Sequence, residues 1–531
     1  MRAYSQSLGA ALPSFCGKAC FRLLSIALTV VALFCLPISG HISSVRELVD
    51  AVAGAKEGAT IMIGPGEFEI PHALKPAVRV TIRGAGMGKS IITAASSFAP
   101  GIDGLPQTQN PDAYLFSFDK TAGIIMSDMT LRGPWLHGAI FANDADSMEL
   151  YNLRIEHFLW CGIRTFQMDY FRVHDNHFHT AGNKIGNIVG AALFMSWTNH
   201  SEFWNNRITS DMDSDARMFG FKGEGGNHLR FHHNSVEIPW FALEIPHKNN
   251  ERIEIDHNMF CGPISVPKYG GGRVVEDGFS FHIHHNWLRK SYAVEGARNS
   301  LIVEYNLFDF DTSDNTGNLI TNHGSNASPG PTIFRNNLVK NPGRGLFWTQ
   351  GVYNQISFHN NHVKANTLSR QDGFFRFAPE TDFATIEIRD NILENTHENP
   401  RPLMRTVESY AARIHNNELR NISDTDGFSN PATANVRGPK KMLYFHVGVN
   451  DEFLVDGWHA GPAATALQPT VIPARPVHHG TGRASEPIAA FFYTLQGRRV
   501  PVVARSLQTY GAGIKVIGND RGQIQRVILS R

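Results

Sequence analysis

The sequence predicts an all-β protein, a right-handed parallel β-helix built of three-strand coils, and three observations lead to this prediction. A strand-ending asparagine recurs between residues 152 and 417 at intervals of 20 to 31 residues. The residues before it alternate between apolar and polar, as in Ile253-Glu254-Ile255, which is the two-residue period of a half-buried strand. No helical periodicity accompanies the repeat, and the repeat is shorter than a propeller blade. Such units cannot bury their faces alone, so we expect them to stack as coils.

The recurring asparagines are expected to stand at a tight corner of each coil. Asparagine tolerates the left-handed backbone region, and its amide can bond to the asparagine of the next coil. Histidines in "HHN" and "HDN" stand beside it, and we expect them to be structural corner residues rather than metal ligands, because their spacing places them along a ladder. The predicted ladder consists of Asn152, Asn176, Asn206, Asn234, Asn258, Asn286, Asn306, Asn337, Asn361, Asn391 and Asn417.

Residues 1–40 are typical of a signal peptide. Lys18 and Arg22 precede the apolar run "LLSIALTVVALFCL", and the small residues of "PISG" follow it. The run is 14 residues long, short of the ~20 residues that span a membrane. We therefore expect cleavage near Gly40, no membrane span in the mature form, and a secreted or cell-surface location, with the periplasm as the alternative.

Residues 41–445 are predicted to form the β-helix catalytic domain, and a capping helix is expected at its start. Ser43 or Ser44 can cap that helix, while Val45, Leu48 and Val52 lie on one face. The helix would cover the open end of the stack, where strand edges would otherwise be exposed.

After residue 445 the repeat ends. Residues 446–487 are rich in proline and alanine, which predicts a linker. Residues 488–531 show alternating strands and are expected to form a small β module. With "LQGRRV" and a strand at its end, this tail resembles the sorting domains of type IX secretion.

The overall charge excludes one class of partner. Lys and Arg number 49 and Asp and Glu number 48, so no global field attracts nucleic acid, and anion binding must come from a local cluster. Of the cysteines beyond the signal, Cys161 and Cys261 are expected to be buried small apolar side chains.

A local cluster of cations is predicted at the ends of successive strands. If Phe219 and Phe221 point inward, Lys222 points outward, and the outward ladder includes Arg164, Ser196 and Glu295. Coils lie about 4.8 Å apart, so Lys222, His247 or Lys248, and Lys268 come from three neighbouring coils. Positive charge at these strand ends suits a polysaccharide that carries one negative charge on each sugar. Glu244 either pairs with Lys222 or Lys248 or orients one of them, and Trp197 is either a sugar-stacking platform or a capped core aromatic.

Two segments carry a family resemblance. "MFGFKGEGGNHLRFHHN" and "ALEIPHKNNERIEIDHN" are similar in layout to two successive coils of the chondroitinase-B and alginate-lyase group, within the pectate-lyase-like superfamily. The "NTD" and "RIK" motifs of polygalacturonases, the "DPHD" of mannuronan epimerases and the "RxPxxR" of classical pectate lyases are absent from the sequence. The chain departs from the group at two positions. Pro246 stands where the group has the arginine that acts as catalytic acid, and Arg217 stands where the group has a calcium-binding carboxylate.

The resemblance implies β-elimination in an acidic, uronic-acid-containing polysaccharide, with alginate as the first substrate. Lys222 takes the role of the base, and His247 or Lys248 that of the acid. Arg217 with Asn199 would neutralise the sugar carboxylate, and like charges around Lys222 would disfavour its protonated form. The residues expected to bind substrate are Asn199, Trp197, Glu244, Lys268, Tyr269, Arg273, Glu295, Arg298, His323 and Arg164.

No metal ligand or cofactor is assigned, calcium remains an alternative, and a monomer is expected. Two other functions stay open. One is a non-catalytic carbohydrate-binding or adhesin β-helix. The other is a glycoside hydrolase, which needs two carboxylates, and here Glu244 with Glu224 or Glu295 would have to supply them.

Overall fold

The computed structural model of the protein describes residues 41–98, 110–133, 136–182, 190–211, 218–238, 240–245, 250–266, 279–289, 294–295, 300–310, 318–322, 331–342, 345–349, 355–365, 374–376, 386–399, 401–405 and 413–423, with five short strands between residues 491 and 529. The expected signal peptide and the expected linker lie outside these residues. Within them, no helix has the length and apolar character to cross a membrane.

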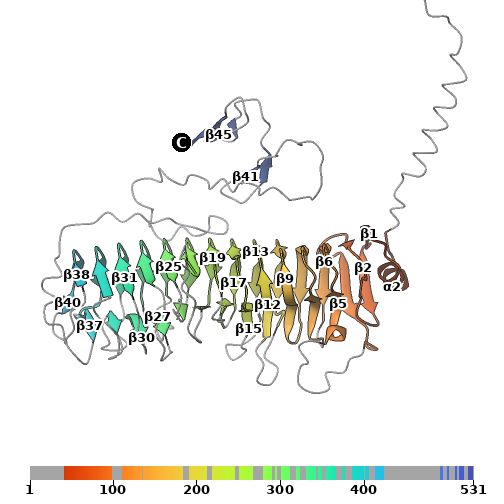
Figure 1. Ribbon diagram of the computed structural model, residues 1–531, viewed down its shortest axis with the longest axis horizontal. Helices are drawn as coiled ribbons and strands as arrows, with labels where there is room; N and C mark the ends of the chain where they lie inside the picture. The colour runs from red at the N-terminus through yellow and green to blue at the C-terminus, as the bar shows by residue number, and fades with distance from the viewer. Residues whose placement is uncertain are drawn as a thin grey trace, which may run out of the picture.

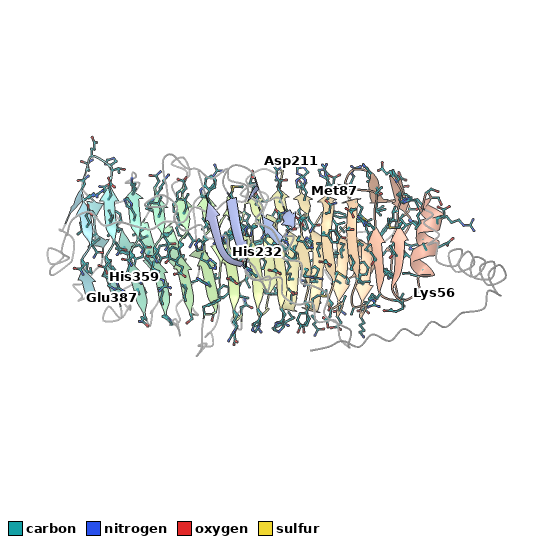
Figure 2. All side chains as sticks on the ribbon, turned by 90° about the horizontal axis from the view of Figure 1, so that it is seen from above. Lys56, Met87, Asp211, His232, His359 and Glu387 are labelled. Atoms are coloured by element: carbon teal, nitrogen blue, oxygen red, sulfur yellow. The ribbon has the colours of Figure 1, made fainter. Side chains whose placement is uncertain are left out.

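The part of the chain that the structure describes is an all-β parallel solenoid with one α-helix at its N-terminal end, as predicted (Figure 1). Two large parallel sheets run along its length, one of 26 strands and one of 12 strands. Labelled side chains from Lys56 to Glu387 mark the two ends of the stack in Figure 2. The predicted fold class is confirmed.

The 12-stranded sheet receives one strand from each successive coil, and neighbours in the sheet are neighbours in this order. Its strands are β5 (Tyr114–Asp119), β7 (Gly138–Asn143), β9 (Cys161–Asp169), β12 (Gly190–Asn199), β15 (Met218–Glu224), β18 (Leu243–Glu244), β21 (Ile264–Ser265), β24 (Val294–Glu295), β27 (Asn318–Asn322), β30 (Gly345–Thr349), β33 (Phe375–Arg376) and β37 (Met404–Arg405). A short 3-10 helix, η1 (Pro111–Ala113), precedes β5.

The 26-stranded sheet contains two rows of strands that meet at the asparagine corner. The first row is β1 (Ala59–Met62), β3 (Val80–Arg83), β6 (Ile125–Arg132), β8 (Glu149–Glu156), β10 (Arg172–His174), β13 (Ser201–Trp204), β16 (Leu229–His232), β19 (Ile253–Asp256), β22 (Phe281–His284), β25 (Leu301–Glu304), β28 (Thr332–Arg335), β31 (Ile356–His359), β34 (Ile386–Arg389) and β38 (Arg413–His415). The second row is β2 (Gly66–Ile70), β4 (Ser90–Ala94), β11 (His177–His179), β14 (Arg207–Thr209), β17 (Ser235–Glu237), β20 (Met259–Phe260), β23 (Trp287–Arg289), β26 (Leu307–Asp309), β29 (Leu338–Lys340), β32 (His362–Ala365), β35 (Ile392–Asn395) and β39 (Glu418–Arg420). The longer strands β6 and β8 run through both rows.

Apolar side chains from both sheets fill the interior and stack from coil to coil. Phe203 and Phe231 lie with ring centroids 4.8 Å apart, and Phe334 and Phe358 lie 5.2 Å apart. All four side chains are fully buried. Each coil contributes an apolar residue at the same position, so a coil becomes stable only when its neighbours cover it.

The N-terminal helix α2 (Val45–Ala53) covers the first coil, as predicted. Ser44 accepts a hydrogen bond from the backbone N–H of Glu47, and the Glu47 carboxylate accepts one from Ser44, which together make a capping box. Leu48 and Val52 are buried against the core. The helix therefore closes the exposed end of the stack.

The asparagine ladder is confirmed from Asn176 to Asn417, with one correction. Each side-chain oxygen accepts bonds from the backbone N–H and the amide of the previous asparagine, at 2.9 to 3.0 Å for the oxygens of Asn234, Asn258 and Asn286. Asn152 does not belong to the ladder, because strand register aligns it with Asp175 and places Leu153 beside Asn176. Leu153 instead donates its backbone N–H to Asn176.

A second correction concerns the left-handed residue at each corner. Positive φ angles of 51° to 60° fall on the residue before each ladder position, and not on the ladder asparagine. This column contains Asp128, Asn152, Asp175, Asn205, His233, His257, His285, Tyr305, Asn336, Asn360, Asp390 and Asn416. His233 and His285 stand in this column, as expected for the histidines of "HHN", and their rings stack on His257 at 4.9 and 5.2 Å. The expectation is wrong in part, because His174, His232 and His284 lie in strands before the corner.

Three smaller sheets complete the described chain. β36 (Arg401–Pro402) pairs with β40 (Ile422–Ser423). Near the C-terminus, β41 (Phe491–Tyr493) and β42 (Arg499–Pro501) pair antiparallel, as do β43 (Thr509–Tyr510), β44 (Ile514–Gly518) and β45 (Ile524–Leu529). These pairings agree with alternating strands in the tail, while the domain boundaries and the sorting role stay predictions. Cys161 and Cys261 are both buried.

Candidate active site

One column of residues runs along the outer face of the 12-stranded sheet. The strand register aligns its members, which are Phe141, Arg164, Phe194, Lys222, Glu244, Ser265, Glu295, Thr321, Trp348 and Arg376. The residues immediately before Lys222, Glu244 and Ser265 are fully buried in the core. Because successive strand residues face opposite sides, this column lies outside the core. We call it the Lys222 column.

Lys222 and Glu244 form the charged centre of this column. The Lys222 Nζ donates to Glu244 Oε2 at 2.8 Å, and the two side chains are 19% and 11% exposed. The ammonium also lies 4.6 Å from the Phe219 ring centroid and 5.4 Å from that of Phe194. Of the two roles left open for Glu244, the structure therefore shows the pairing with Lys222.

This pairing changes the expected electrostatics around Lys222. Like charges were expected to surround its amine, but the nearest described charged group is a carboxylate. Phe219 was expected to point inward with Phe221, and it lies instead on the outer face near Lys222. Ser196 was expected in the same ladder, but it pairs in register with Glu224, two positions further along the strand.

An aromatic layer covers the outer face beside Lys222. Phe141, Trp160, Phe194 and Phe219 are buried in it, and Phe166 packs against it. The sequence interpretation missed this layer. The continuous apolar run "AALFM" in β12 was its signal, because a strand buried on both faces loses the polar alternation.

Arg164 is part of this layer and is 3% exposed. Its guanidinium lies 3.7 Å from the Phe166 ring centroid and 4.0 Å from that of Phe194, and it donates to the carbonyl oxygens of Thr165 and Phe194. Burial lowers the pKa of Arg164 from its ordinary value. The expected contact of Arg164 with substrate is wrong for this structure, because the rings cover its charge.

Trp197 is exposed at the edge of this face. Its side chain is 50% exposed, and its φ angle is +54°. Gly225 of the next coil, with a φ angle of +84°, lies so close that an added Cβ would stand 2.8 Å from the indole. Glycine there makes room for the ring, so a flat apolar surface faces solvent. Such a surface suits stacking on a sugar ring.

Asn199 is a structural residue in this geometry. Its amide donates to Asp169 Oδ1 at 3.0 Å, and its oxygen accepts from the backbone N–H of Asn227 at 3.1 Å. Both ends of the amide are already engaged in joining neighbouring coils. This does not fit the expected role of Asn199 in neutralising a sugar carboxylate.

The remaining predicted site residues have no described side chain. Glu295 lies in β24, so its place in the Lys222 column is known from the backbone register alone. The others lie outside the described residues, and they are Arg217, His247, Lys248, Lys268, Tyr269, Arg273, Arg298 and His323. By sequence, Lys248 follows the end of β18 by four residues, and Lys268 follows the end of β21 by three.

Comparison with known proteins gives similarity to solved structures only. No protein-family model and no curated protein sequence matches the chain. It is similar to an alginate lyase from Paenibacillus sp. str. FPU-7, with 13% identity, coverage of 53% of this chain and 96% of that one, and a TM-score of 0.37. The PL6 family alginate lyase AlyGC is 13% identical, with coverage of 67% of this chain and 52% of that one, and a TM-score of 0.40. The tailspike protein of E. coli bacteriophage HK620, solved with a pentasaccharide, is 10% identical, with coverage of 72% of this chain and 73% of that one, and a TM-score of 0.46. At these identities and scores the similarities carry no argument about activity.

Proposed function

We propose that this protein is a polysaccharide lyase that cleaves an acidic, uronic-acid-containing polysaccharide by β-elimination at the Lys222 column. The observation that carries the proposal is the half-buried Lys222–Glu244 pair at 2.8 Å beside the aromatic layer of the outer face. The main core lies on the other side of the sheet, so this charged pair faces away from it. Its position, one coil from the exposed Trp197, fits a groove that holds a sugar chain.

In this reaction Lys222 would remove the proton at C5 of the sugar. The adjacent carboxylate must be neutralised first, because a cation or donor there stabilises the enolate-like intermediate, and this is usually the largest catalytic contribution. Arg217 is proposed for that role. Glu244 fixes the position of Nζ through a hydrogen bond of 2.8 Å. His247 or Lys248 would protonate the leaving oxygen, and a placed base or acid contributes about 10²–10⁴-fold each.

Alginate is the first proposed substrate, followed by pectic chains and glycosaminoglycans. Export through the expected signal peptide, a monomeric state and activity without calcium belong to the same proposal. So does the resemblance to the chondroitinase-B and alginate-lyase group. The C-terminal strands are proposed to form a small module that assists secretion.

The test is to incubate the purified protein with a panel of uronic-acid polymers and to record ultraviolet absorbance. Only elimination creates the unsaturated uronate that absorbs ultraviolet light. We expect absorbance to rise with one of these polymers and to be lost in Lys222→Ala. Lys340→Ala is the control, since Lys340 lies in β29 of the other sheet. If no polymer gives an unsaturated product, the proposal is wrong.

One observation favours a glycoside hydrolase as the second candidate. Glu224 and Glu244 lie in adjacent coils and are offset by two residues along the strand. The spacings of a sheet put such positions about 8 Å apart, within the range of an inverting pair of carboxylates. Glu224→Gln would abolish hydrolysis but leave elimination largely intact. New reducing ends without ultraviolet absorbance would indicate the hydrolase, and binding without either product would indicate the carbohydrate-binding alternative.

A further inference from the structure

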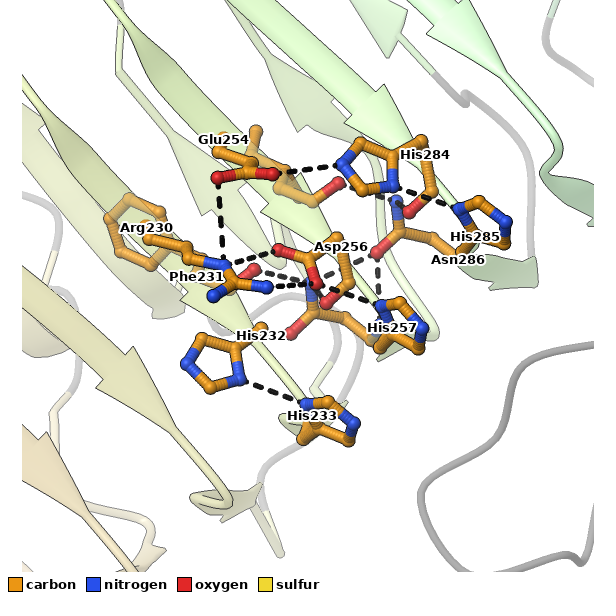
Figure 3. Close-up of polar contacts among 12 residues, drawn as sticks. Arg230, Phe231, His232, His233, Glu254, Asp256, His257, His284, His285 and Asn286 are labelled. Carbon is orange, nitrogen blue, oxygen red and sulfur yellow. Dashed lines mark hydrogen bonds and ion pairs between the residues drawn. The ribbon is translucent and has the colours of Figure 1, made fainter. Parts of the chain in front are cut away.

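A group of metal-binding side chains lies on the 26-stranded sheet, away from the Lys222 column. One ligand atom from each of Glu254, His282 and His284 lies within 4.8 Å of the other two. Glu254 Oε1 is 3.1 Å from His284 Nε2, and the two histidine rings have centroids 4.1 Å apart. Figure 3 shows Glu254 and His284 facing each other across neighbouring coils. We call these three residues the His282 cluster.

The cluster interrupts a regular ladder of charges. Strand register aligns Glu149, Arg172, Glu202, Arg230, Glu254 and His282, so that acidic and basic residues alternate from coil to coil. Two residues further along the strands, a histidine contacts the acid of the previous coil in three places. The distances are 3.3 Å for His174 to Glu149, 3.0 Å for His232 to Glu202 and 3.1 Å for His284 to Glu254.

Each of these histidine–acid contacts belongs to a set of three residues, and the third residue distinguishes the sets. In the first two sets it is an arginine, Arg172 or Arg230, and in the last it is His282. A guanidinium has only donors, so it neutralises the acid but cannot ligate a cation. Imidazole has a lone pair and is a common metal ligand. The same backbone arrangement therefore makes a salt-bridge ladder twice and a set of three ligands once.

We propose that the His282 cluster binds a zinc ion. Two imidazoles and one carboxylate match the ligand types and the number of protein ligands at zinc sites that keep a fourth position open. Tetrahedral zinc with Zn–N and Zn–O bonds near 2.1 Å needs ligand atoms about 3.4 Å apart. The ligand atoms of the cluster lie within 4.8 Å of one another, so side-chain rotation must bring them closer. All three side chains are partly exposed, so an ion can enter from solvent.

Neighbouring residues hold the ligands in place. Glu304 Oε1 lies 2.8 Å from His282 Nε2, and Arg335 fixes the other oxygen of Glu304 at 2.5 Å. His285 Nδ1 lies 2.8 Å from His284 Nδ1, which leaves the Nε2 of His284 directed at Glu254. Arg230 lies 3.6 Å from the second oxygen of Glu254. Contacts of this kind orient the ligands of metal sites.

The ion would join two coils, because Glu254 lies in β19 and the two histidines lie in β22. Binding to the folded state alone raises the apparent stability with ligand concentration. The inference is independent of the proposed lyase activity, since the cluster and Lys222 lie in different sheets.

The experiment is a zinc titration of the full chain after removal of metal. Calorimetry gives the affinity, and elemental analysis of the dialysed protein gives the number of ions bound. We expect one ion whose affinity falls by about 100-fold or more in His284→Gln, since even loss of a supporting residue costs 10–100-fold. His282→Arg should abolish binding and keep the fold, because arginine is the residue that the ladder carries at Arg172 and Arg230.

His232→Gln is the matched control. His232 contacts Glu202 as His284 contacts Glu254, but its set contains Arg230. Its zinc affinity should equal that of the unchanged protein, and circular dichroism of each variant reports the fold. If His232→Gln and His284→Gln reduce zinc binding equally, or if neither reduces it, the proposal is wrong.

Discussion

At the scale of single residues, the proposed chemistry of the Lys222 column depends on the position of one amine. A free lysine amine is protonated at neutral pH and is a poor base. Glu244 Oε2, at 2.8 Å, fixes the position of the Lys222 amine beside the aromatic layer. Glu244 is thus expected to act as a positioning residue for Lys222.

Lys222→Arg tests this role against simple anion binding. Guanidinium keeps its charge and stays protonated, so it can hold a substrate carboxylate but cannot accept a proton. We expect a loss in turnover of about 10²–10⁴-fold, with unchanged thermal unfolding, measured with the polymer that gives unsaturated product. Turnover near that of the unchanged protein would mean that Lys222 only binds the negative charge of the substrate. The base would then be sought at His247, Lys268 or Tyr269.

Histidines at the left-handed corners give the fold a dependence on pH. Burial, with the nearby His257 and His232, lowers the pKa of His233 from 6.5 to about 3. Burial, with His257 and His284, lowers that of His285 to about 3. Below pH 6.5 these two histidines bind protons in the unfolded chain but not in the folded chain. Stability is therefore complete above this pH and falls as the pH drops toward 3.

The expected slope is at most about 1.4 kcal/mol of unfolding free energy per pH unit for each histidine. His233→Asn should flatten the slope between pH 6 and 4, since asparagine occupies the same corner at Asn205 and Asn360 with similar φ angles. Urea unfolding at several pH values measures it. His72→Asn is the control, because His72 is exposed and outside the corner column. A slope equally steep in both variants would contradict the argument.

At the scale of elements, the asparagine ladder joins the coils through buried polar groups. Asn361 is fully buried, donates its amide to Asn391 and to the Phe334 carbonyl, and accepts two bonds from Asn337. Each asparagine thus satisfies backbone groups that would otherwise be buried without partners. The ladder fixes the register of the corner, since a shift of one residue would bury the wrong side chain.

Asn361→Ala and Asn360→Gly compare neighbours in one corner. Alanine at Asn361 leaves several buried donors and acceptors unsatisfied, so we expect a loss of roughly 3–5 kcal/mol. Asn360 is exposed and has a φ angle of +55°, which glycine adopts readily, so Asn360→Gly should change stability little. Thermal and chemical unfolding measure both. Equal losses in the two variants would show that the ladder bonds are not the cause.

At the scale of the whole molecule, the two proposed sites lie on different sheets of one solenoid. The Lys222 column lies on the 12-stranded sheet, and the His282 cluster lies on the 26-stranded sheet. A solenoid transmits contacts mainly between neighbouring coils. A metal ion at the His282 cluster is therefore expected to affect stability and not turnover.

Removal of metal should separate the effect of a bound ion on stability from any effect on turnover. Because Arg217 stands at the position of the calcium-binding carboxylate in the resembling group, we expect lyase activity to survive treatment with EDTA. The same treatment should lower the midpoint of thermal unfolding if zinc is bound beforehand. If EDTA abolishes turnover and calcium restores it, the argument from Arg217 is wrong, and Asp213, Asp215 and Glu244 become candidate calcium ligands.

The repeat made the fold predictable from the sequence. A fixed period of strand-ending asparagines, with alternating residues before it, leaves few architectures for a chain without helices. The capping helix at Val45–Ala53 was equally local, since its cap and its apolar face stand within ten residues. The outward position of Lys222 followed from alternation along one strand.

Neighbours across coils were decided by the tertiary structure. Lys222 meets Glu244, and Glu254 meets His284, only because coils of unequal length stack in one particular register. Alternation tells which face a residue takes but not which residue of the next coil lies beside it. Arg164 was placed outward correctly, yet a ring of its own strand and one of the next coil cover it. The sequence by itself determined the stack of coils, since that depends on a pattern repeated in every unit. The tertiary structure decided among the charge pairs that the sequence left open, such as Glu244 with Lys222, since each pair depends on the exact length of a single coil.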